Sequence, residues 1–200
     1  MGAGGHAKVV ADAAIVLGRD EFVGFLDDNP ELTGRSIIGW PVLGPIQVWR
    51  DFKIDAVIPA IGANRTRRDI MVREQSLGAT AKTIVHPRAT VSAFASLRAG
   101  VVVLAGAVIN AGATIGDDVI VNSGAIVEHD CQVGSHVHIA PGCYIAGDVR
   151  IGEGALLGIG SRILPGVKLG AWCVVGAGAV VTTDVEDHAT VAGIPARRLR

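Results

Sequence analysis

Residues 128–138 hold the densest group of side chains suited to acid–base chemistry. Glu128, His129 and Asp130 are consecutive, and His136 and His138 follow closely. Histidine titrates near neutral pH, and a flanking carboxylate fixes its tautomer and raises its basicity. The pattern predicts a general base among these histidines, and a solvated surface cluster is the alternative.

A glycine-rich turn near residue 1 is a second candidate site. Residues 2–8 read Gly-Ala-Gly-Gly-His-Ala-Lys and lead into apolar residues at helical spacing that end at Gly18. Such a turn lets the backbone approach phosphates, while a helix N-terminus supplies partial positive charge. With Asp27 about twenty residues on, the match to G-x-G-x-x-A predicts a nucleotide site. A plain turn is the alternative, and the pattern does not separate NAD from a sugar nucleotide.

The elements around this turn alternate between helix and strand. Strand-like runs at 22–26, 56–61 and 80–85, with a polar helix near 64–75, predict a small Rossmann-like parallel α/β sheet over residues 1–84. Ligands of such sheets lie at the carboxyl ends of the strands, here loops 4–6, 27–29 and 62–64. The first strand, which should precede the glycine turn, is missing. Either the native start lies upstream of Met1 or the sheet lacks that strand.

A six-residue repeat over residues 85–185 positions the histidines. One large aliphatic residue recurs every six positions, and the residue two places before each is Ala, Val, Cys or Ser. The large residues are Val91, Leu97, Val103, Ile109, Ile115, Val121, Val127, Val133, Ile139, Ile145, Ile151, Leu157, Ile163, Leu169, Val175 and Val181. This repeat is typical of a parallel β-helix of about five coils, three hexads to a coil. Residues 186–200 are expected to form a C-terminal tail.

The expected 18-residue coil places the polar residues relative to one another. His129 stacks between Ala111 and Gly147, whose small size leaves room for a substrate. His138 lies half a coil further on, so the two histidines point to different sides of the same prism. A ligand that contacts both must be long or lie between two prisms, and either case favours an oligomer with its site at a subunit boundary. A zinc site like that of the hexapeptide-repeat carbonic anhydrases is an alternative. The three histidines crowd into half a coil, however, rather than converging from neighbouring coils.

Composition narrows the classes of partner. Lys and Arg total 18 against 19 Asp and Glu, a balance that gives no electrostatic reason to expect nucleic acid or an anionic membrane. Cys131, Cys143 and Cys173 occupy small inward positions on three different faces, which predicts buried thiols rather than disulfides or metal ligands. No signal peptide or membrane-spanning stretch is recognisable, so a cytoplasmic location is expected.

Five motifs spread over nearly the whole chain carry a family resemblance. They are Gly-Ala-Gly-Gly-His-Ala-Lys at 2–8, Phe-Leu-Asp-Asp-Asn at 25–29, Ala-Ile-Gly at 60–62, Val-Glu-His-Asp-Cys at 127–131 and Ala-Gly-Ile-Pro-Ala-Arg at 192–197. On these residues the chain resembles the sugar O-acyltransferases of the sialic acid O-acetyltransferase type. That hexapeptide-repeat family includes bacterial N-acetyltransferases of UDP- and GDP-linked 4-amino-4,6-dideoxy sugars. The resemblance implies a left-handed β-helix and a homotrimer, with acetyl-CoA as co-substrate in the groove between adjacent prisms.

The resemblance also implies a role for individual residues. His129 would be the general base of a direct acetyl transfer, and Asp130, which stands where some relatives have glutamate, would strengthen it. Acetyl-CoA contacts are implied at His138, Gly147, Ile159 and Ala177. Contacts to a nucleotide-sugar acceptor are implied at Gly4, Gly5, His6, Asp27, Asp28 and Gly62. No metal is implied.

Three other functions share much of this pattern. An O-acetyltransferase of a sialic-acid-like sugar would use the same residues. A zinc-dependent hydratase would need the histidines as metal ligands, and a non-catalytic scaffold would bind nucleotide but no coenzyme A. The sequence identifies neither the sugar nor its nucleotide.

Overall fold

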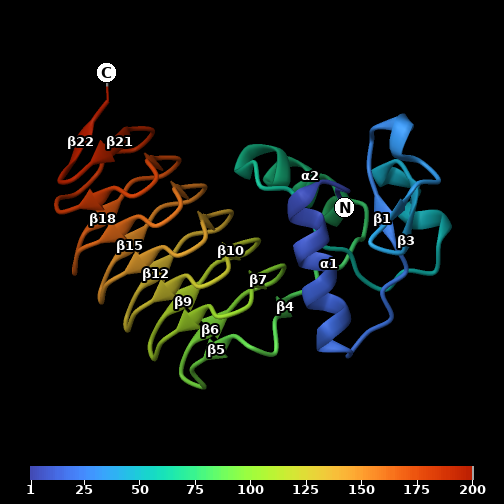
Figure 1. Ribbon diagram of the computed structural model, residues 1–200, viewed down its shortest axis with the longest axis horizontal. Helices are drawn as coiled ribbons and strands as arrows, with labels where there is room; N and C mark the ends of the chain where they lie inside the picture. Colours follow the sequence, from blue (N-terminus) through green and yellow to red (C-terminus); the bar gives the residue numbers. More distant parts are fainter. Residues whose placement is uncertain (200) are drawn as a thin grey trace.

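The computed structural model describes residues 1–199, in which a small α/β domain lies against one side of a long triangular column of parallel strands (Figure 1). The column is the parallel β-helix expected from the hexads, with the left-handed coil that the resemblance implied. Its strands are β4 (Ile84–Val85), β5 (Thr90–Val91), β6 (Ser96–Leu97), β7 (Val102–Val103), β8 (Val108–Ile109), β9 (Thr114–Ile115), β10 (Ile120–Val121), β11 (Ile126–Val127), β12 (Gln132–Val133), β13 (His138–Ile139), β14 (Tyr144–Ile145), β15 (Arg150–Ile151), β16 (Leu156–Leu157), β17 (Arg162–Ile163), β18 (Lys168–Leu169), β19 (Val174–Val175) and β20 (Val180–Val181).

Three sheets form the sides of the column. One runs β22-β21-β19-β16-β13-β10-β7-β4, the second β20-β17-β14-β11-β8-β5, and the third β18-β15-β12-β9-β6. Paired residues lie 18 positions apart: Ile120, for instance, is in register with Val102 on one side and His138 on the other. The observed register therefore confirms a coil of three hexads.

The hexad residues build the core of the column. Both the large and the small inward residues are buried, except at the open first coil, where Ala89, Val91, Ala95 and Leu97 are partly buried. Cys131, Cys143 and Cys173 are buried and free, as expected. Because burial disfavours the thiolate, it raises the pKa of all three thiols, that of Cys173 to about 11.

The N-terminal domain keeps both expected helices but shortens its strands. Helix α1 (Gly5–Leu17) follows the glycine turn and α2 (Asn64–Ser76) the third loop. Only β1 (Phe25–Leu26) forms in the run 22–26, and the runs 56–61 and 80–85 pair through a single parallel bridge between Val57 and Ala81.

A hairpin that the sequence reading missed completes the small sheet. It consists of β2 (Ser36–Ile37) and β3 (Trp40–Gly44), and β3 pairs in parallel with β1. Two 3₁₀ helices, η1 (Pro30–Leu32) and η2 (Ile46–Asp51), flank this hairpin.

Helix α1 fixes the domain against the column. Its apolar residues share a core with Ile84, Val102 and Leu104, which lie on the eight-stranded sheet. Both α1 and α2 therefore lie between the column and the small sheet (Figure 1). This packing explains why the stretch from Val101 to Leu104 is apolar without interruption, since alternate residues face the column core and the helix.

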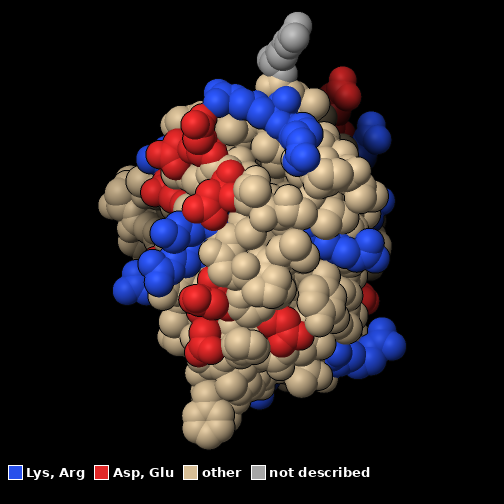
Figure 2. Space-filling model, turned by 90° about the vertical axis from the view of Figure 1, so that its left-hand side faces the viewer, with Lys and Arg blue, Asp and Glu red and all other residues tan. Residues whose placement is uncertain are grey.

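Residues 190–198 form two strands where the sequence analysis expected a C-terminal tail. Strands β21 (Thr190–Gly193) and β22 (Ala196–Arg198) form an antiparallel hairpin that extends the eight-stranded sheet and caps the column. On the side shown in Figure 2, acidic and basic side chains alternate around a broad neutral surface, in keeping with the balanced composition. Within residues 1–199, neither helix has the length and hydropathy needed to cross a membrane.

Candidate active site

His129 and Asp130 form an exposed pair at one edge of the column. They follow β11 and precede β12, at the turn between the six-stranded and five-stranded sheets. His129 Nδ1 lies 2.8 Å from Asp130 Oδ2, and the two side chains are 64% and 68% exposed. This hydrogen bond raises the pKa of His129 and leaves its Nε2 free to accept a proton. This geometry is suited to general-base chemistry by His129.

Two glycines make room for this pair. A Cβ on Gly147 would lie 2.5 Å from His129 Nε2, so the imidazole rests directly on the glycine one coil above. A Cβ on Gly112 would lie 2.5 Å from Asp130 Oδ1. The predicted stacking of His129 under Gly147 is therefore present. Any larger residue at either position would displace one member of the pair.

Ile159 and Ala177 lie at the other edge of the same sheet. Ile159 precedes β17, whereas Gly147 follows β14, so the two positions flank the six-stranded sheet. The N–H of Gly178 donates to the carbonyl of Ile159 at 2.8 Å, which places Ala177 one coil above Ile159. Ile159 is 63% exposed. Three of the four residues implied in acetyl-CoA binding thus border one face.

His138 occupies a different environment, on β13 where the column meets the N-terminal domain. Its Nδ1 donates to the carbonyl of Gly62 at 3.2 Å, and its Nε2 accepts from Asn122 Nδ2 at 3.1 Å. The N–H of Ser123 donates to Asn122 Oδ1, which turns the amide nitrogen toward the histidine. Burial lowers the pKa of His138 to about 4, so the ring is neutral near pH 7.

His136, the third member of the sequence cluster, belongs to a buried link between the two domains. Its Nδ1 lies 2.9 Å from Asp118 Oδ2, and that oxygen also accepts from Arg67 Nε at 3.1 Å. Arg67, on α2, is fully buried and donates further to the carbonyls of Ile61 and His136. The histidine cluster of the sequence is thus divided among three environments.

Asn122, Arg67 and Asp118 are the polar residues of this region that sequence reasoning missed. Asn122 follows an apolar strand, β10, and is buried beside His138. Arg67 sits in a helix otherwise rich in solvent-facing charges. No spacing signal distinguishes these residues, because the contacts that bury them come from the other domain.

The glycine turn forms an open helix N-terminus. Helix α1 begins at Gly5 with Gly4 as its N-cap, and a Cβ on either glycine would meet no atom within 4 Å. The nearby acidic pair partly serves the fold. Asp27 accepts from the N–H groups of Ala3 and Asn29, and Asp28 accepts from the N–H of Ile46. The open backbone above Gly4 and Gly5 is suited to an anionic group.

His6 connects this turn with the column. Its ring centroid lies 6.0 Å from that of His138, and its Nε2 is buried without a hydrogen-bond partner among the described residues. Burial lowers the pKa of His6, with the charge of Arg67 acting in the same direction. His6, Gly62 and His138 therefore meet at the junction of the two domains. The described side chains include no group of three or more His, Cys, Asp and Glu residues placed to hold a metal ion.

Comparisons with known proteins match both halves of the chain. The model for the PglD N-terminal domain matches residues 1–73, and the model for the bacterial transferase hexapeptide (six repeats) matches 112–147 and 148–183. A search of curated proteins gave no match.

Several solved structures share the whole fold. The acetyltransferase domain of PglB from Neisseria gonorrhoeae FA1090, in complex with acetyl coenzyme A, is 42% identical with a TM-score of 0.94 and coverage of 99% of this chain and 96% of that one. PerB from Caulobacter crescentus, in complex with CoA and GDP-perosamine, is 38% identical with a TM-score of 0.94 and coverage of 100% and 95%. WeeI from Acinetobacter baumannii AYE is 27% identical with a TM-score of 0.92 and coverage of 99% and 97%.

Identity of this level over nearly the full length of both chains, together with the two family models, confirms the resemblance found in the motifs. The chain belongs to the hexapeptide-repeat sugar acetyltransferases that carry a PglD-type N-terminal domain.

Proposed function

We propose that this protein transfers the acetyl group of acetyl-CoA to the amino group of a nucleotide-activated amino sugar. The observation that carries the proposal is the exposed His129, hydrogen-bonded to Asp130 and seated on Gly147. The similarity to PerB, solved with CoA and GDP-perosamine, supports an amino sugar rather than a hydroxyl acceptor. An O-acetyltransferase of a sialic-acid-like sugar is therefore the second choice.

The proposed reaction is a direct transfer. The sugar amine attacks the thioester carbonyl as His129 Nε2 removes its proton, and Asp130 holds the resulting imidazolium through Nδ1. The C–S bond then breaks, and His129 returns the proton to the departing sulfur, which gives free CoA and the acetamido sugar. The backbone N–H of Gly147 is the candidate donor to the carbonyl oxygen during attack. The buried thiols, whose pKa values are raised, are unsuited to form an acyl-enzyme.

The coenzyme is proposed to lie along the six-stranded sheet. Gly147 borders one edge of that face, and Ile159 and Ala177 border the other. His138 is assigned a coenzyme contact only by resemblance, since both of its ring nitrogens already bond within this chain. A hydrogen bond from His138 to acetyl-CoA would therefore require one of these two bonds to exchange.

The homotrimer implied by the resemblance is proposed to form through the same face. Tyr144, Ile159 and Leu164 lie on or beside the six-stranded sheet, and all three are large hydrophobic residues with exposed side chains. Grouped exposed apolar residues are typical of interaction surfaces. Sedimentation equilibrium should give three times the chain mass of 20.5 kDa, and a monomer at micromolar concentration would contradict this assembly.

The acceptor is proposed to bind at the N-terminal domain. Gly4 and Gly5 offer open backbone at the N-terminus of α1, and His6 and Gly62 lie beside them at the domain junction. Asp27 and Asp28 complete the set, each with a carboxylate already held by backbone N–H groups. Such held carboxylates are suited to accept hydrogen bonds from sugar or ribose hydroxyls.

Thiol release from acetyl-CoA, measured against a panel of UDP- and GDP-linked amino sugars and their hydroxy analogues, tests this function. Turnover with an amino sugar but not with its hydroxy analogue is expected. His129→Asn should lower turnover by roughly 10² to 10⁴-fold, the usual contribution of a general base. His188→Asn is the matched control, because His188 is also an exposed histidine at a turn of the column. Equal activity of the two variants would refute the assignment of His129.

A cytoplasmic location stays a prediction. It is supported by the three cysteines, all free and buried in the column.

A further inference from the structure

Phe94 is a large aromatic side chain that lies almost fully in solvent. It is 82% exposed, the highest value among the large hydrophobic residues that the structure describes. In the turn between β5 and β6, its N–H donates to Ser92 Oγ at 3.1 Å and its carbonyl accepts from the N–H of Gly112. The backbone is therefore held while the ring projects outward. An aromatic ring presented in this way is suited to packing against a partner.

Phe94 lies on the edge of the column that carries the proposed base. The turns that join the six-stranded sheet to the five-stranded sheet stack on one another, and Phe94, Gly112 and Asp130 follow at intervals of 18 residues. We call this stack of turns the His129 edge. At about 4.8 Å per coil, Phe94 lies roughly 10 Å below Asp130, and the small residues Ala111 and Gly112 leave the edge between them flat.

The N-terminal domain lies on the opposite side of the column. In a triangular column the edge between two sheets faces away from the third sheet, and that third, eight-stranded sheet holds the N-terminal domain. An acceptor bound at the glycine turn would have to pass around the column to reach His129 of the same copy. The proposed reaction therefore needs the His129 edge of one subunit to face the N-terminal domain of another, and the contact inferred from this geometry rests on the proposed function.

Helix α1 lies on the side of its domain that borders the groove between subunits. It packs on Leu104, in a turn between the eight-stranded and six-stranded sheets, whereas α2 follows the opposite turns, which Arg67 binds. Ile159 and Ala177, the proposed coenzyme contacts, lie in turns of the same stack as Leu104. With the coenzyme in the groove, the His129 edge of the next subunit lies against this stack. Helix α1 is therefore the element that this edge meets.

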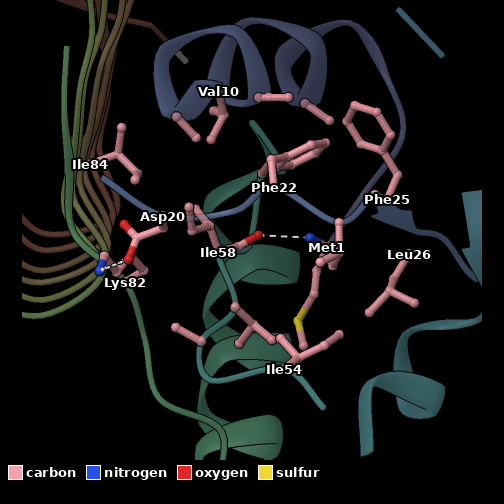
Figure 3. A pocket seen from close by; sticks show the side chains of 18 of the residues that line it. Met1, Val10, Asp20, Phe22, Phe25, Leu26, Ile54, Ile58, Lys82 and Ile84 are labelled. Carbon is pink, nitrogen blue, oxygen red and sulfur yellow. Dashed lines mark hydrogen bonds and ion pairs between the residues drawn. The ribbon is translucent and has the colours of Figure 1, made fainter. Parts of the chain in front are cut away.

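The outer face of α1 carries exposed aliphatic residues. Its inner face is occupied, since Val10 points into a cavity inside the N-terminal domain whose lining includes Ile84 of the column (Figure 3). On the outer side Val9 and Val16, about two turns apart, are 44% and 53% exposed, and Ile15 beside Val16 is 38% exposed. The solvent face of a surface helix ordinarily carries polar residues. We call Val9 and Val16 the α1 patch.

The heights of Phe94 and the α1 patch match. The glycine turn lies against β13, half a coil above His129, so an acceptor bound there is nearly level with the proposed base. From this turn α1 runs down the eight-stranded sheet toward β4 (Figure 1). A descent of roughly 10 Å, at about 1.5 Å per residue, corresponds to about seven residues and ends between Val9 and Val16.

We infer that Phe94 of one subunit packs on Val9 and Val16 of helix α1 in the adjacent subunit. In the closed ring of a homotrimer the same contact forms at each of the subunit boundaries. Because α1 begins at the glycine turn, the contact would fix the position of the adjacent subunit's acceptor site relative to His129. Phe94 would thus be a positioning residue, which touches neither the acceptor nor acetyl-CoA.

Cross-linking between subunits tests the contact. Phe94→Cys is combined with Val16→Cys, and the purified full chain is treated with a short bismaleimide and separated on a denaturing gel. The control combines Phe94→Cys with Val72→Cys, because Val72 is a valine of α2 that is also 53% exposed. The three native thiols are buried in the column and should not react. We expect chains linked into dimers and trimers for the Val16 pair, and unlinked chains for the Val72 pair and for each single variant.

Two substitutions of Phe94 test the positioning role. Phe94→Ser removes the apolar contact, whereas Phe94→Leu keeps a large apolar side chain. We expect Phe94→Ser to lower kcat with the nucleotide-linked amino sugar by about tenfold, because a small displacement of the acceptor relative to His129 slows the reaction. The KM values for the sugar and for acetyl-CoA should stay within about twofold of the wild type, and kcat of Phe94→Leu should stay close to that of the wild type.

Several outcomes would overturn the inference. Equal cross-linking of the Val16 and Val72 pairs, or none in either, would show that the His129 edge does not face α1. A monomer in sedimentation would leave Phe94 without a second copy to contact. An unchanged kcat in Phe94→Ser would contradict the positioning role, and a raised KM for the sugar in its place would show that Phe94 contacts the acceptor itself. Cross-linking is measured without substrate, so its failure is distinct from failure of the proposed acetyl transfer.

Discussion

Replacing Gly147 with alanine would test the catalytic geometry with a single methyl group. That methyl would lie 2.5 Å from His129 Nε2, whereas ordinary van der Waals contact begins at 3.4 Å. The imidazole must therefore retreat by about 0.9 Å, or rotate away. Because misplacing a reacting group by about 1 Å can cost roughly 10²-fold, we expect kcat/KM to fall by about that factor.

The fold should tolerate this change. His129 is 64% exposed, so its ring can swing into solvent without opening the core. The midpoint of urea unfolding should therefore stay close to that of the wild type. Gly124→Ala serves as the control, because a Cβ on Gly124 meets nothing within 4 Å, although its φ of +66° makes alanine mildly strained there.

A double-mutant cycle distinguishes displacement of His129 from other causes of a lower kcat/KM in Gly147→Ala. Acetyl transfer is measured by thiol release for Gly147→Ala, His129→Ala and the double variant. If the added methyl acts through the imidazole, the double variant should be no slower than His129→Ala alone. The reasoning would be refuted if Gly147→Ala kept kcat/KM within about twofold of the wild type, or if the two losses multiplied.

Three further predictions follow from the polar contacts. Asp130→Asn removes the partner that raises the pKa of His129. The acidic limb of the kcat/KM profile, where His129 gains a proton, should therefore move to lower pH, and the plateau should fall about tenfold or more. A limb that stays at the same pH would exclude this pairing. The pKa of His138 is about 4 in the folded protein and 6.5 when unfolded, so the ring's contribution to the free energy of unfolding is fully present above pH 6.5 and falls by about 3 kcal/mol as the pH drops to 4. In urea titrations, the free energy of unfolding should depend less on pH in His138→Gln than in the wild type. An equal pH dependence would contradict the assignment. Arg67→Ala leaves Asp118 buried without its arginine and should cost about 3–5 kcal/mol in urea unfolding; a loss below about 1 kcal/mol would show that the link between the domains contributes little.

Much of the fold could be predicted from the sequence because the column is a local repeat. Each hexad contributes one large and one small residue to the core, and its partners lie 18 positions away in the sequence. His129 and Gly147 are also 18 positions apart, so their stacking could be predicted in the same way. The N-terminal strands were harder to read, since their pairing depends on β3, which comes from a hairpin without a clear sequence pattern.

The sequence by itself determined the column, the pairing of His129 with Asp130 and the open glycine turn, because each depends on neighbours at a fixed spacing. Only the tertiary structure decided what became of the other histidines. His136 binds Asp118 in the link to α2, and His138 meets Gly62, because the N-terminal domain packs against the eight-stranded sheet. Contacts between domains bring together residues with no regular separation along the chain, so no periodic pattern records them.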